Sequence, residues 1–260
     1  MTAPCDLAGR GVLVTRPAAQ AEGLCRLIES AGGRAVRFPT IAIEPAADAA
    51  ALAARLAERW DLMYFVSRNA VEQALALVPD GTWPNVVQVA AVGRGTALTL
   101  GAAGRAPDLV PGERFESEAL LAMPELADMR GRRVLIVRGE GGRALFAETM
   151  TARGAEVRFA EVYRRVLPER DPADLLANWS SEVAAVTATS DEVLLNLVEL
   201  LGPAGRDVLL ATPLVVIAER TERTARGLGF AVVAVAERAE DAAILDALCG
   251  LLASAEIQGR

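Results

Sequence analysis

The sequence predicts an α/β protein made of two similar parallel-sheet domains, with the second domain inserted into the first. Two observations predict this class. Short apolar runs alternate with amphipathic helical segments along the whole chain, which is typical of parallel sheets covered by helices. The chain also repeats itself at a spacing of 122 residues, as seen in the pairs Gly32 and Gly154, Ser67 and Thr189, and Val71 and Val193. The competing interpretation is that any two βα units resemble one another.

Composition supports a folded chain of about two domains. The sequence has 260 residues, of which 52% are hydrophobic and 23% charged. This length is sufficient for two modest domains, and this hydrophobic content is too high for a disordered chain. No apolar run is long enough to span a bilayer, and the start lacks a basic region followed by an apolar run. We therefore expect a cytoplasmic protein with no membrane partner.

Charge and residue usage exclude several chemistries. The net charge of −7 argues against a nucleic-acid partner, although local arginines can still bind a small anion. The chain has no histidine, so it lacks the commonest general base and the commonest metal ligand, and we expect no metal site. Cys5, Cys25 and Cys249 stand far apart without a CxxC motif, and we interpret them as reduced, incidental thiols.

The first repeat has clear boundaries. Residues 11–16 form an apolar run that ends in a polar turn, as a buried parallel strand does. Pro17 opens a helix at a position where proline is tolerated, and Gly32 and Gly33 end that helix. Residues 36–43 then form an extended segment that is longer than one sheet needs.

The remaining elements follow from apolar runs bounded by turn residues and from Ala- and Leu-rich amphipathic segments. Ser117 with Glu118, and Thr189 with Ser190 and Asp191, are typical of helix starts. The predicted strands are 62–66, 86–92, 108–111, 133–137, 157–166, 183–187, 214–217 and 231–236. The predicted helices are 46–59, 70–77, 96–104, 117–121, 144–153, 171–177, 191–201, 221–229 and 241–252.

Two long extended segments define the domain organisation. Residues 36–43 and 157–166 each carry Val-Arg-Phe and follow a helix and a glycine. We interpret them as paired linker strands, one leaving a domain and one returning. Residues 1–40 with 167–260 would then form the first domain and residues 41–166 the inserted domain, with a hinged cleft between them.

Ligands of open parallel sheets bind beyond the carboxyl ends of the strands. The turns expected there are rich in Ser, Thr, Gly and Arg, and the helix N-termini that follow offer free N–H groups to anions. A simpler interpretation is that these residues only cap helices and form tight turns. The candidate binding residues are Thr15, Arg16, Ser67, Arg68, Asn69, Gly93, Arg94, Thr96, Ser117, Arg138, Gly139, Thr189, Ser190, Arg220 and Thr221.

The sequence lacks two common kinds of functional motif. The glycines at 139, 141 and 142 match neither a dinucleotide-binding fingerprint nor a Walker A loop, because no Lys-Ser/Thr follows them. Without histidine, a Ser- or Cys-based nucleophilic triad is disfavoured. Nucleotide binding and hydrolase chemistry therefore have little support.

An ordered set of short motifs resembles the uroporphyrinogen-III synthase family. Each motif alone has little specificity, but together they follow the order found in that family, from about residue 11 to residue 252. The motifs are Val-Leu-Val-Thr-Arg-Pro from Val12, Phe65–Val71, Ala91–Ala97, Ser117–Leu121, Arg138–Arg143, Val162–Arg164 and Glu219–Thr221. The turn Thr187–Asp191 departs from the family's more usual Ser/Thr-Ser-Gly or Ser-Ala type of turn but keeps its hydroxyl groups.

The resemblance implies two flavodoxin-like domains joined by a two-stranded ladder, without a metal or other cofactor. It implies that hydroxymethylbilane, a linear tetrapyrrole polycarboxylate, is cyclised with inversion of ring D and loss of water. It also implies a catalytic role for Tyr163, whose counterpart in the Val-Tyr-Arg motif faces the cleft; the alternative is that Tyr163 packs within the linker. Tyr64 lies in an apolar run and is interpreted as a core residue.

Two other function classes stay open. A two-lobed cytoplasmic protein that binds or senses a small anion would have the same architecture without catalysis. An unrelated pair of flavodoxin-like domains could act only in assembly. For the enzyme we expect a monomer, and transient contact with the preceding pathway enzyme is left open.

Overall fold

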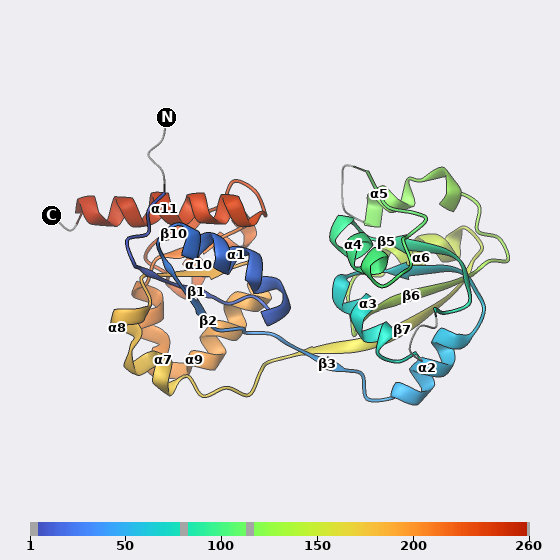
Figure 1. The fold of residues 1–260 in the computed structure, drawn as a ribbon, viewed down its shortest axis with the longest axis horizontal. Coiled ribbons are helices and arrows are strands. Elements are labelled where there is room, and N and C mark those ends of the chain that lie inside the picture. The colour runs from blue at the N-terminus through green and yellow to red at the C-terminus, as the bar shows by residue number, and fades with distance from the viewer. Residues whose placement is uncertain (1–4, 79–82, 113–116, 259–260) are drawn as a thin grey trace. The chain divides into compact units, whose positions relative to one another are not determined.

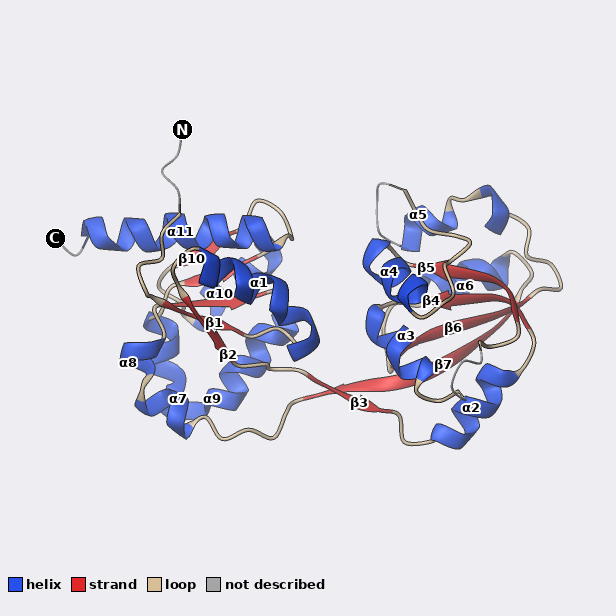
Figure 2. Ribbon diagram, viewed as in Figure 1, coloured by secondary structure: helices blue, strands red, loops and turns tan. Residues whose placement is uncertain are grey.

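A computed structural model describes residues 5–78, 83–112 and 117–258 of the chain. The chain divides into two compact units, Met1–Ala42 with Val166–Arg260, and Ile43–Arg165 (Figure 1). We call the first the discontinuous unit and the second the inserted unit. Each unit is built around one five-stranded sheet with helices packed against it (Figure 2). No helix in the described parts of the chain has the length and apolar character needed to cross a bilayer.

The sheet of the discontinuous unit has the strand order β10-β9-β8-β1-β2, and all its pairs are parallel. In this order β1 has a neighbour on each side, and all four of its residues are buried. The strands are β1 (Gly11–Val14), β2 (Arg34–Arg37), β8 (Ala185–Ala188), β9 (Leu214–Val216) and β10 (Val233–Val235). The helices are α1 (Ala18–Ser30), α7 (Ala173–Ala177), α8 (Trp179–Glu182), α9 (Asp191–Ala211), α10 (Glu219–Leu228) and α11 (Asp241–Gln258).

The sheet of the inserted unit has the order β3-β7-β6-β4-β5, with β4, β5, β6 and β7 paired in parallel. The strands are β3 (Ala42–Pro45), β4 (Trp60–Phe65), β5 (Val86–Ala91), β6 (Arg133–Gly139) and β7 (Glu156–Val166). The helices are α2 (Ala49–Ala57), α3 (Arg68–Leu75), α4 (Arg94–Ala102), α5 (Ser117–Leu121), the 3₁₀ turn η1 (Pro124–Leu126) and α6 (Leu145–Ala152). The α/β class with parallel sheets predicted from the sequence is confirmed.

Strand β4 shows how the inserted unit builds its core. Successive side chains of a strand point to opposite faces of the sheet, so an apolar strand buried on both faces feeds two clusters. Met63 and Phe65 pack in the cluster that also holds Tyr163, whereas Leu62 and Tyr64 pack in the cluster on the other face. The two tyrosines of the chain therefore belong to opposite faces of one sheet.

The predicted long strand 36–43 is wrong, because the segment forms two short strands in different sheets. β2 ends at Arg37 and β3 begins at Ala42. Pro39 lies in the break and has no N–H to give to a ladder. The hydroxyl of Thr40 lies 3.3 and 3.2 Å from the carbonyl oxygens of Thr15 and Val193 and shares its one hydrogen between them, which ties the break into the discontinuous unit. The mostly apolar composition of residues 36–43 predicted one continuous strand, although Pro39 was a signal for the break.

Three smaller expectations also change. The predicted edge strand 108–111 makes only an isolated parallel bridge between Ala90 and Leu109. The short helix α8 was not predicted. The predicted helix 191–201 is followed directly by a second helical stretch, and the two join at Gly202, which has a φ of 60° and a ψ of −167°. Leu201 remains buried at this joint, so the kink redirects the chain without opening the core.

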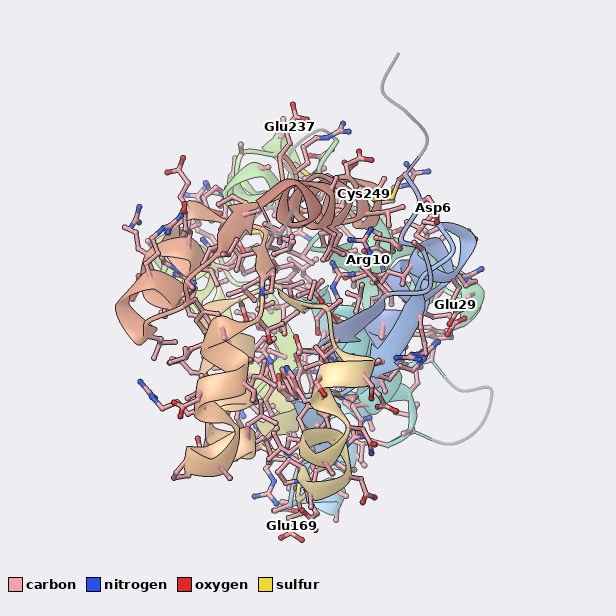
Figure 3. The ribbon with its side chains drawn as sticks, turned by 90° about the vertical axis from the view of Figure 1, so that its left-hand side faces the viewer. Asp6, Arg10, Glu29, Glu169, Glu237 and Cys249 are labelled. Carbon is pink, nitrogen blue, oxygen red and sulfur yellow. A yellow bond between two sulfur atoms is a disulfide. The ribbon has the colours of Figure 1, made fainter. Side chains whose placement is uncertain are left out.

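The interpretation of all three cysteines as free thiols is wrong in this structure. Cys5 and Cys249 form a disulfide, visible beside the label of Cys249 in Figure 3, and Cys25 is a free, buried thiol. The fold brings the N-terminal segment onto α11, where the Arg10 guanidinium donates to the carbonyl of Leu252 at 3.0 Å. A sequence separation of 244 residues gave no local signal for this pairing.

Candidate functional site

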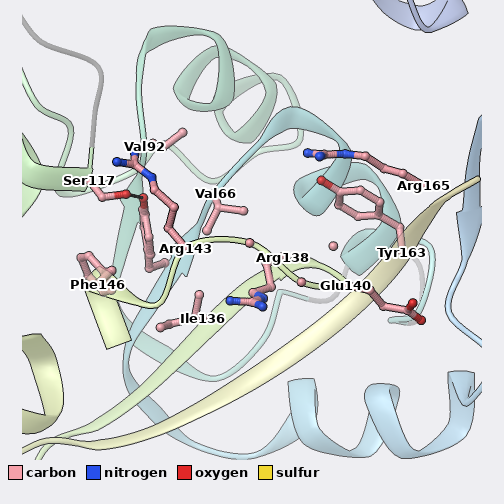
Figure 4. A pocket seen from close by; sticks show the side chains of 14 residues that line it. Val66, Val92, Ser117, Ile136, Arg138, Glu140, Arg143, Phe146, Tyr163 and Arg165 are labelled. Atoms are coloured by element: carbon pink, nitrogen blue, oxygen red, sulfur yellow. Dashed lines mark hydrogen bonds between the residues drawn. The ribbon is translucent and has the colours of Figure 1, made fainter. Parts of the chain in front are cut away.

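A pocket of about 220 Å³ lies in the inserted unit, beyond the carboxyl ends of β4 and β6 (Figure 4). This is where ligands of parallel sheets bind. Apolar side chains line part of the wall, and the glycine-rich turn after β6 supplies polar groups. The lining residues are Tyr64, Val66, Val92, Ser117, Ile136, Arg138, Gly139, Glu140, Gly141, Gly142, Arg143, Phe146, Tyr163 and Arg165. Ser117, Arg138, Gly139 and Tyr163 among them are candidates predicted from sequence.

Tyr163 enters the pocket from β7. Its side chain is 1% exposed, and its hydroxyl lies 3.1 Å from the Ser67 hydroxyl. A β-carbon added to Gly139 would lie 2.5 Å from the Tyr163 ring, so only glycine leaves room for the ring in this position. The Glu140 N–H also donates to the Tyr163 carbonyl at 2.8 Å. The ring is therefore fixed by packing and its hydroxyl by one side-chain partner.

Ser67 has two roles at once. It is the N-cap of α3, where its hydroxyl oxygen accepts from the Ala70 N–H at 3.1 Å. The same oxygen faces the Tyr163 hydroxyl, which comes from a strand distant in sequence. Ser67 is therefore a helix cap whose oxygen also contacts the Tyr163 hydroxyl.

A second hydroxyl pair lies in the same pocket. The Tyr64 hydroxyl is 3.1 Å from the Ser117 hydroxyl, and the Tyr64 ring packs against Phe146 at a centroid distance of 4.1 Å. Burial raises the pKa of Tyr64 above its ordinary value, because the charged phenolate would lose its hydration. The sequence interpretation of Tyr64 as a core residue describes its ring but missed its hydroxyl.

Four arginines in or beside the predicted binding turns are paired with carboxylates. Arg138 lies 3.2 Å from Glu161 and over the ring of Phe159 at 4.6 Å. The other three pairs are Arg143 with Glu118 at 2.6 Å, Arg220 with Asp191 at 3.1 Å, and Arg16 with Asp241. An acidic ligand that uses these arginines must replace an internal carboxylate, an exchange that costs little where the pair is exposed.

Several candidates of the discontinuous unit serve the fold. Thr15 is fully buried, and its hydroxyl donates to the Thr187 carbonyl. Thr221 is 1% exposed and donates to Asp191 at 2.6 Å. Ser190 caps α9 by accepting from the Val193 N–H at 3.2 Å, and Thr189 before it is half-buried. The observed contacts of Thr15, Ser190 and Thr221 are therefore structural.

The other candidates of the inserted unit surround the starts of α3 and α4. The guanidinium of exposed Arg68 fills the space where a β-carbon on Gly95 would lie, 2.6 Å from its Nε. Asn69 and Thr96 are buried. Gly93 is the N-cap of α4 and offers no side chain, so the first N–H groups of α4 receive no side-chain cap there. Arg94, the first residue of α4, is exposed.

Sequence reasoning missed four polar residues of the pocket: Tyr64, Glu140, Arg143 and Arg165. Arg143 was within reach, because it stands in the same glycine-rich turn as Arg138 and Gly139. Figure 4 shows Arg143 on the side of Ser117, whereas Arg165 lies beside Tyr163. Among the described residues, no group of three or more His, Cys, Asp or Glu side chains is arranged to hold a metal ion.

Comparison with known proteins gives one consistent family. Residues 22–246 match the family described as uroporphyrinogen-III synthase HemD. The uroporphyrinogen-III synthase of Escherichia coli (strain K12) is 39% identical over 243 residues, covering 91% of this chain and 99% of the relative. The enzyme of the same name from Salmonella typhimurium (strain LT2) is 40% identical over the same shares of the two chains.

Solved structures agree on the fold. A mutant uroporphyrinogen III synthase from the extremely thermophilic bacterium Thermus thermophilus aligns with a TM-score of 0.54 at 21% identity, covering 96% of this chain and 100% of that chain. Uroporphyrinogen-III synthetase from Helicobacter pylori 26695 aligns with a TM-score of 0.56 at 14% identity, covering 93% and 99%. At these identities the likeness concerns the α/β fold alone.

Proposed function

Because the chain belongs to the uroporphyrinogen-III synthase family, we propose that it cyclises hydroxymethylbilane to uroporphyrinogen III, with inversion of ring D and loss of water. The observation that carries this function is the match to the enterobacterial enzymes over nearly their whole length. The chain is thus an enzyme of porphyrin and heme biosynthesis. We propose that it works in the cytoplasm, as a monomer and without a cofactor.

The reaction requires three things of the protein. The terminal hydroxyl of the substrate must leave with a proton as water. The azafulvene-like cation that remains must be held, and the two ends of the linear tetrapyrrole must approach each other. Fixing a flexible substrate in a curled conformation supplies much of the rate, because it removes the entropic cost of ring closure. A proton donor near the leaving oxygen supplies a further factor.

Tyr163 is the proposed proton donor. Its hydroxyl lies beside Ser67, and a tyrosine hydroxyl has one hydrogen that it can donate. When Tyr163 gives its proton to the leaving oxygen, the Ser67 hydroxyl can donate a hydrogen bond to the phenolate. Ser67 itself keeps the hydrogen bond from Ala70, so its oxygen stays in place during this step.

The test of Tyr163 is the Tyr163→Phe variant. We expect the initial rate of type III formation to fall by about 10²-fold or less, since general acids contribute roughly 10² to 10⁴ and substrate positioning remains. Ser67→Ala should cost about fivefold to tenfold, the value of one hydrogen bond. Thermal melting checks folding, and a normal rate in folded Tyr163→Phe would return Tyr163 to a packing role.

The arginines and the helix N-termini among the remaining candidates are proposed to bind the substrate's acetate and propionate groups. Arg16, Arg138 and Arg220 would act by charge-assisted hydrogen bonds after exchanging their internal carboxylates. Arg68, Arg94 and the free N–H groups at the starts of α3 and α4 would add further anion contacts. Binding spread over many groups predicts that no single hydroxyl substitution abolishes turnover.

Product analysis separates this function from the alternative of a binding or sensing protein without catalysis. Freshly made hydroxymethylbilane closes spontaneously to the type I isomer, so a binder alone gives type I product. The enzyme gives type III product at a rate proportional to protein concentration. Type I product alone, from folded protein, would contradict the proposed function.

A further inference from the structure

The pocket also contains the hydroxyl pair of Tyr64 and Ser117. Arg143 lines the same pocket and is paired with the partly exposed Glu118. We propose that Tyr64, Ser117 and Arg143 form a carboxylate-binding subsite that holds one acidic arm of the tetrapyrrole. This inference rests on the proposed function for the identity of its ligand. Tyr64, Ser117 and Arg143 would be substrate-positioning residues, distinct from the proposed acid Tyr163.

The hydroxyl pair has a hydrogen to spare. Tyr64 and Ser117 together carry two hydroxyl hydrogens, and the bond between them at 3.1 Å uses one. Within the described residues, neither hydroxyl makes another side-chain hydrogen bond. Whichever hydroxyl donates within the pair, the other retains a hydrogen that can be given to a ligand oxygen in the pocket.

The phenol is held as a neutral donor. The Tyr64 side chain is 1% exposed and its ring packs against Phe146, so the hydroxyl cannot turn away to solvent. Burial raises the pKa of Tyr64, which keeps the phenol protonated throughout the neutral range. A neutral donor forms a stronger hydrogen bond with an anionic oxygen than with a neutral one.

Arg143 supplies the charge. It extends from the glycine-rich turn, where Gly141 and Gly142 have φ values of 72° and 104° and make the tight turn accessible. Its guanidinium pairs with Glu118 at 2.6 Å, but the two side chains are 65% and 46% exposed. Such a pair is worth little in water, so a ligand carboxylate can replace Glu118. Figure 4 shows Arg143 and Ser117 on the same side of the pocket.

The lining favours a carboxylate attached to an apolar ring system. Val66, Val92 and Ile136 form the apolar part of a pocket of about 220 Å³, which suits a short acidic arm and the edge of one pyrrole ring. One guanidinium and one hydroxyl hydrogen match the two oxygens of a carboxylate. Acetate and propionate arms both end in a carboxylate, so either arm can occupy the proposed subsite.

The experiment compares Ser117→Ala, Tyr64→Phe/Ser117→Ala and Arg143→Gln with the wild type. In Ser117→Ala the Tyr64 hydroxyl remains and can donate, so we expect KM to rise only about twofold to threefold. The double variant and Arg143→Gln should each raise KM about tenfold, with kcat within twofold, because the subsite positions substrate without proton transfer. Arg130→Gln is the matched control, because Arg130 is an exposed arginine of the same unit paired with Asp128 away from the pocket.

Binding of uroporphyrin III, followed by quenching of intrinsic fluorescence, provides a readout independent of turnover. Its Kd should rise about tenfold in Arg143→Gln, and the dependence of log Kd on log salt should become less steep by about one charge. Ser117→Ala/Arg143→Gln, which alters only partly exposed side chains, replaces the double variant if removal of the Tyr64 hydroxyl prevents folding.

The outcomes separate the two hypotheses. Unchanged KM and unchanged porphyrin Kd in folded Arg143→Gln and in folded Tyr64→Phe/Ser117→Ala, or its replacement Ser117→Ala/Arg143→Gln, would overturn the subsite. Type III product from the wild type would then leave the proposed function standing. If wild type made no type III product, the porphyrin titration would still show whether these residues bind a polycarboxylate. A fall in kcat without a change in KM would also overturn the positioning role.

Discussion

At the scale of single residues, Gly139 controls where the Tyr163 ring can lie. A methyl group at position 139 would meet the ring at 2.5 Å, and β6 already shifts register against β7 between Arg138 and Gly139. We expect Gly139→Ala to displace the ring and to lower the rate of type III formation by about 10²-fold, because a 1 Å misplacement of a catalytic group can cost roughly that much. Gly101→Ala is the control, since Gly101 lies in α4 with nothing within 4 Å of its added β-carbon. Equal rates in both variants would show that the ring position is unimportant.

The buried hydroxyl of Tyr64 should appear in the alkaline stability of the protein. Burial raises the folded-state pKa of Tyr64 above the unfolded value of about 10. The corresponding stability is complete below the unfolded pKa and is lost as pH rises through the folded pKa, because the unfolded chain releases the proton first. Urea unfolding between about pH 8 and pH 11 should therefore show a steeper decline for wild type than for Tyr64→Phe. Parallel curves would contradict the burial of an ionisable phenol.

At the scale of elements, the sequence predicts the strands and helices well where each is a continuous apolar pattern. The predictions of β4, β6 and the helices that follow them are confirmed. In each of these elements the apolar pattern and the turn residues that end it lie within the same short stretch of sequence. The predicted strand is wrong between Phe38 and Ile41 because the missing N–H of Pro39 breaks the ladder, although three of these four side chains are apolar. The sequence did not predict contacts between distant elements. The pairs of Tyr64 with Ser117 and of Arg138 with Glu161 depend on how these elements are placed against one another, which no local sequence pattern encodes.

The joint inside α9 provides a test at this scale. Gly202 has a φ of 60° and a ψ of −167°, a region essentially restricted to glycine, and Pro203 begins the next helical stretch. We expect Gly202→Ala to destabilise the protein by about 1–3 kcal/mol in urea unfolding. Gly227→Ala, within α10 and with open space at its β-carbon, should be neutral or stabilising by up to about 1 kcal/mol. Equal stability of the two variants would mean that the backbone at Gly202 relaxes without cost.

At the scale of the whole molecule, the Cys5–Cys249 disulfide closes almost the entire chain into a loop. In the chain-entropy account a long loop constrains the unfolded state strongly, and removing such a bond typically costs about 2–4 kcal/mol. Oxidised wild type should melt several degrees above Cys249→Ser, and the difference should vanish in dithiothreitol because both proteins are then reduced. A melting temperature of wild type that dithiothreitol leaves unchanged would show that the disulfide does not stabilise the fold.

The chain passes between its two units at only two places, Ala42 to Ile43 and Arg165 to Val166. Units joined by so few passes move relative to each other unless a large interface holds them. A tetrapyrrole whose acidic arms bind the proposed arginines of each unit should restrict that motion. Small-angle X-ray scattering should therefore show a narrower distance distribution after addition of uroporphyrin III. Arg16→Gln/Arg220→Gln, which removes two proposed anion contacts of the discontinuous unit, should retain porphyrin binding but reduce this narrowing. An unchanged scattering profile at saturating porphyrin would contradict the restriction and leave recognition to the inserted unit alone.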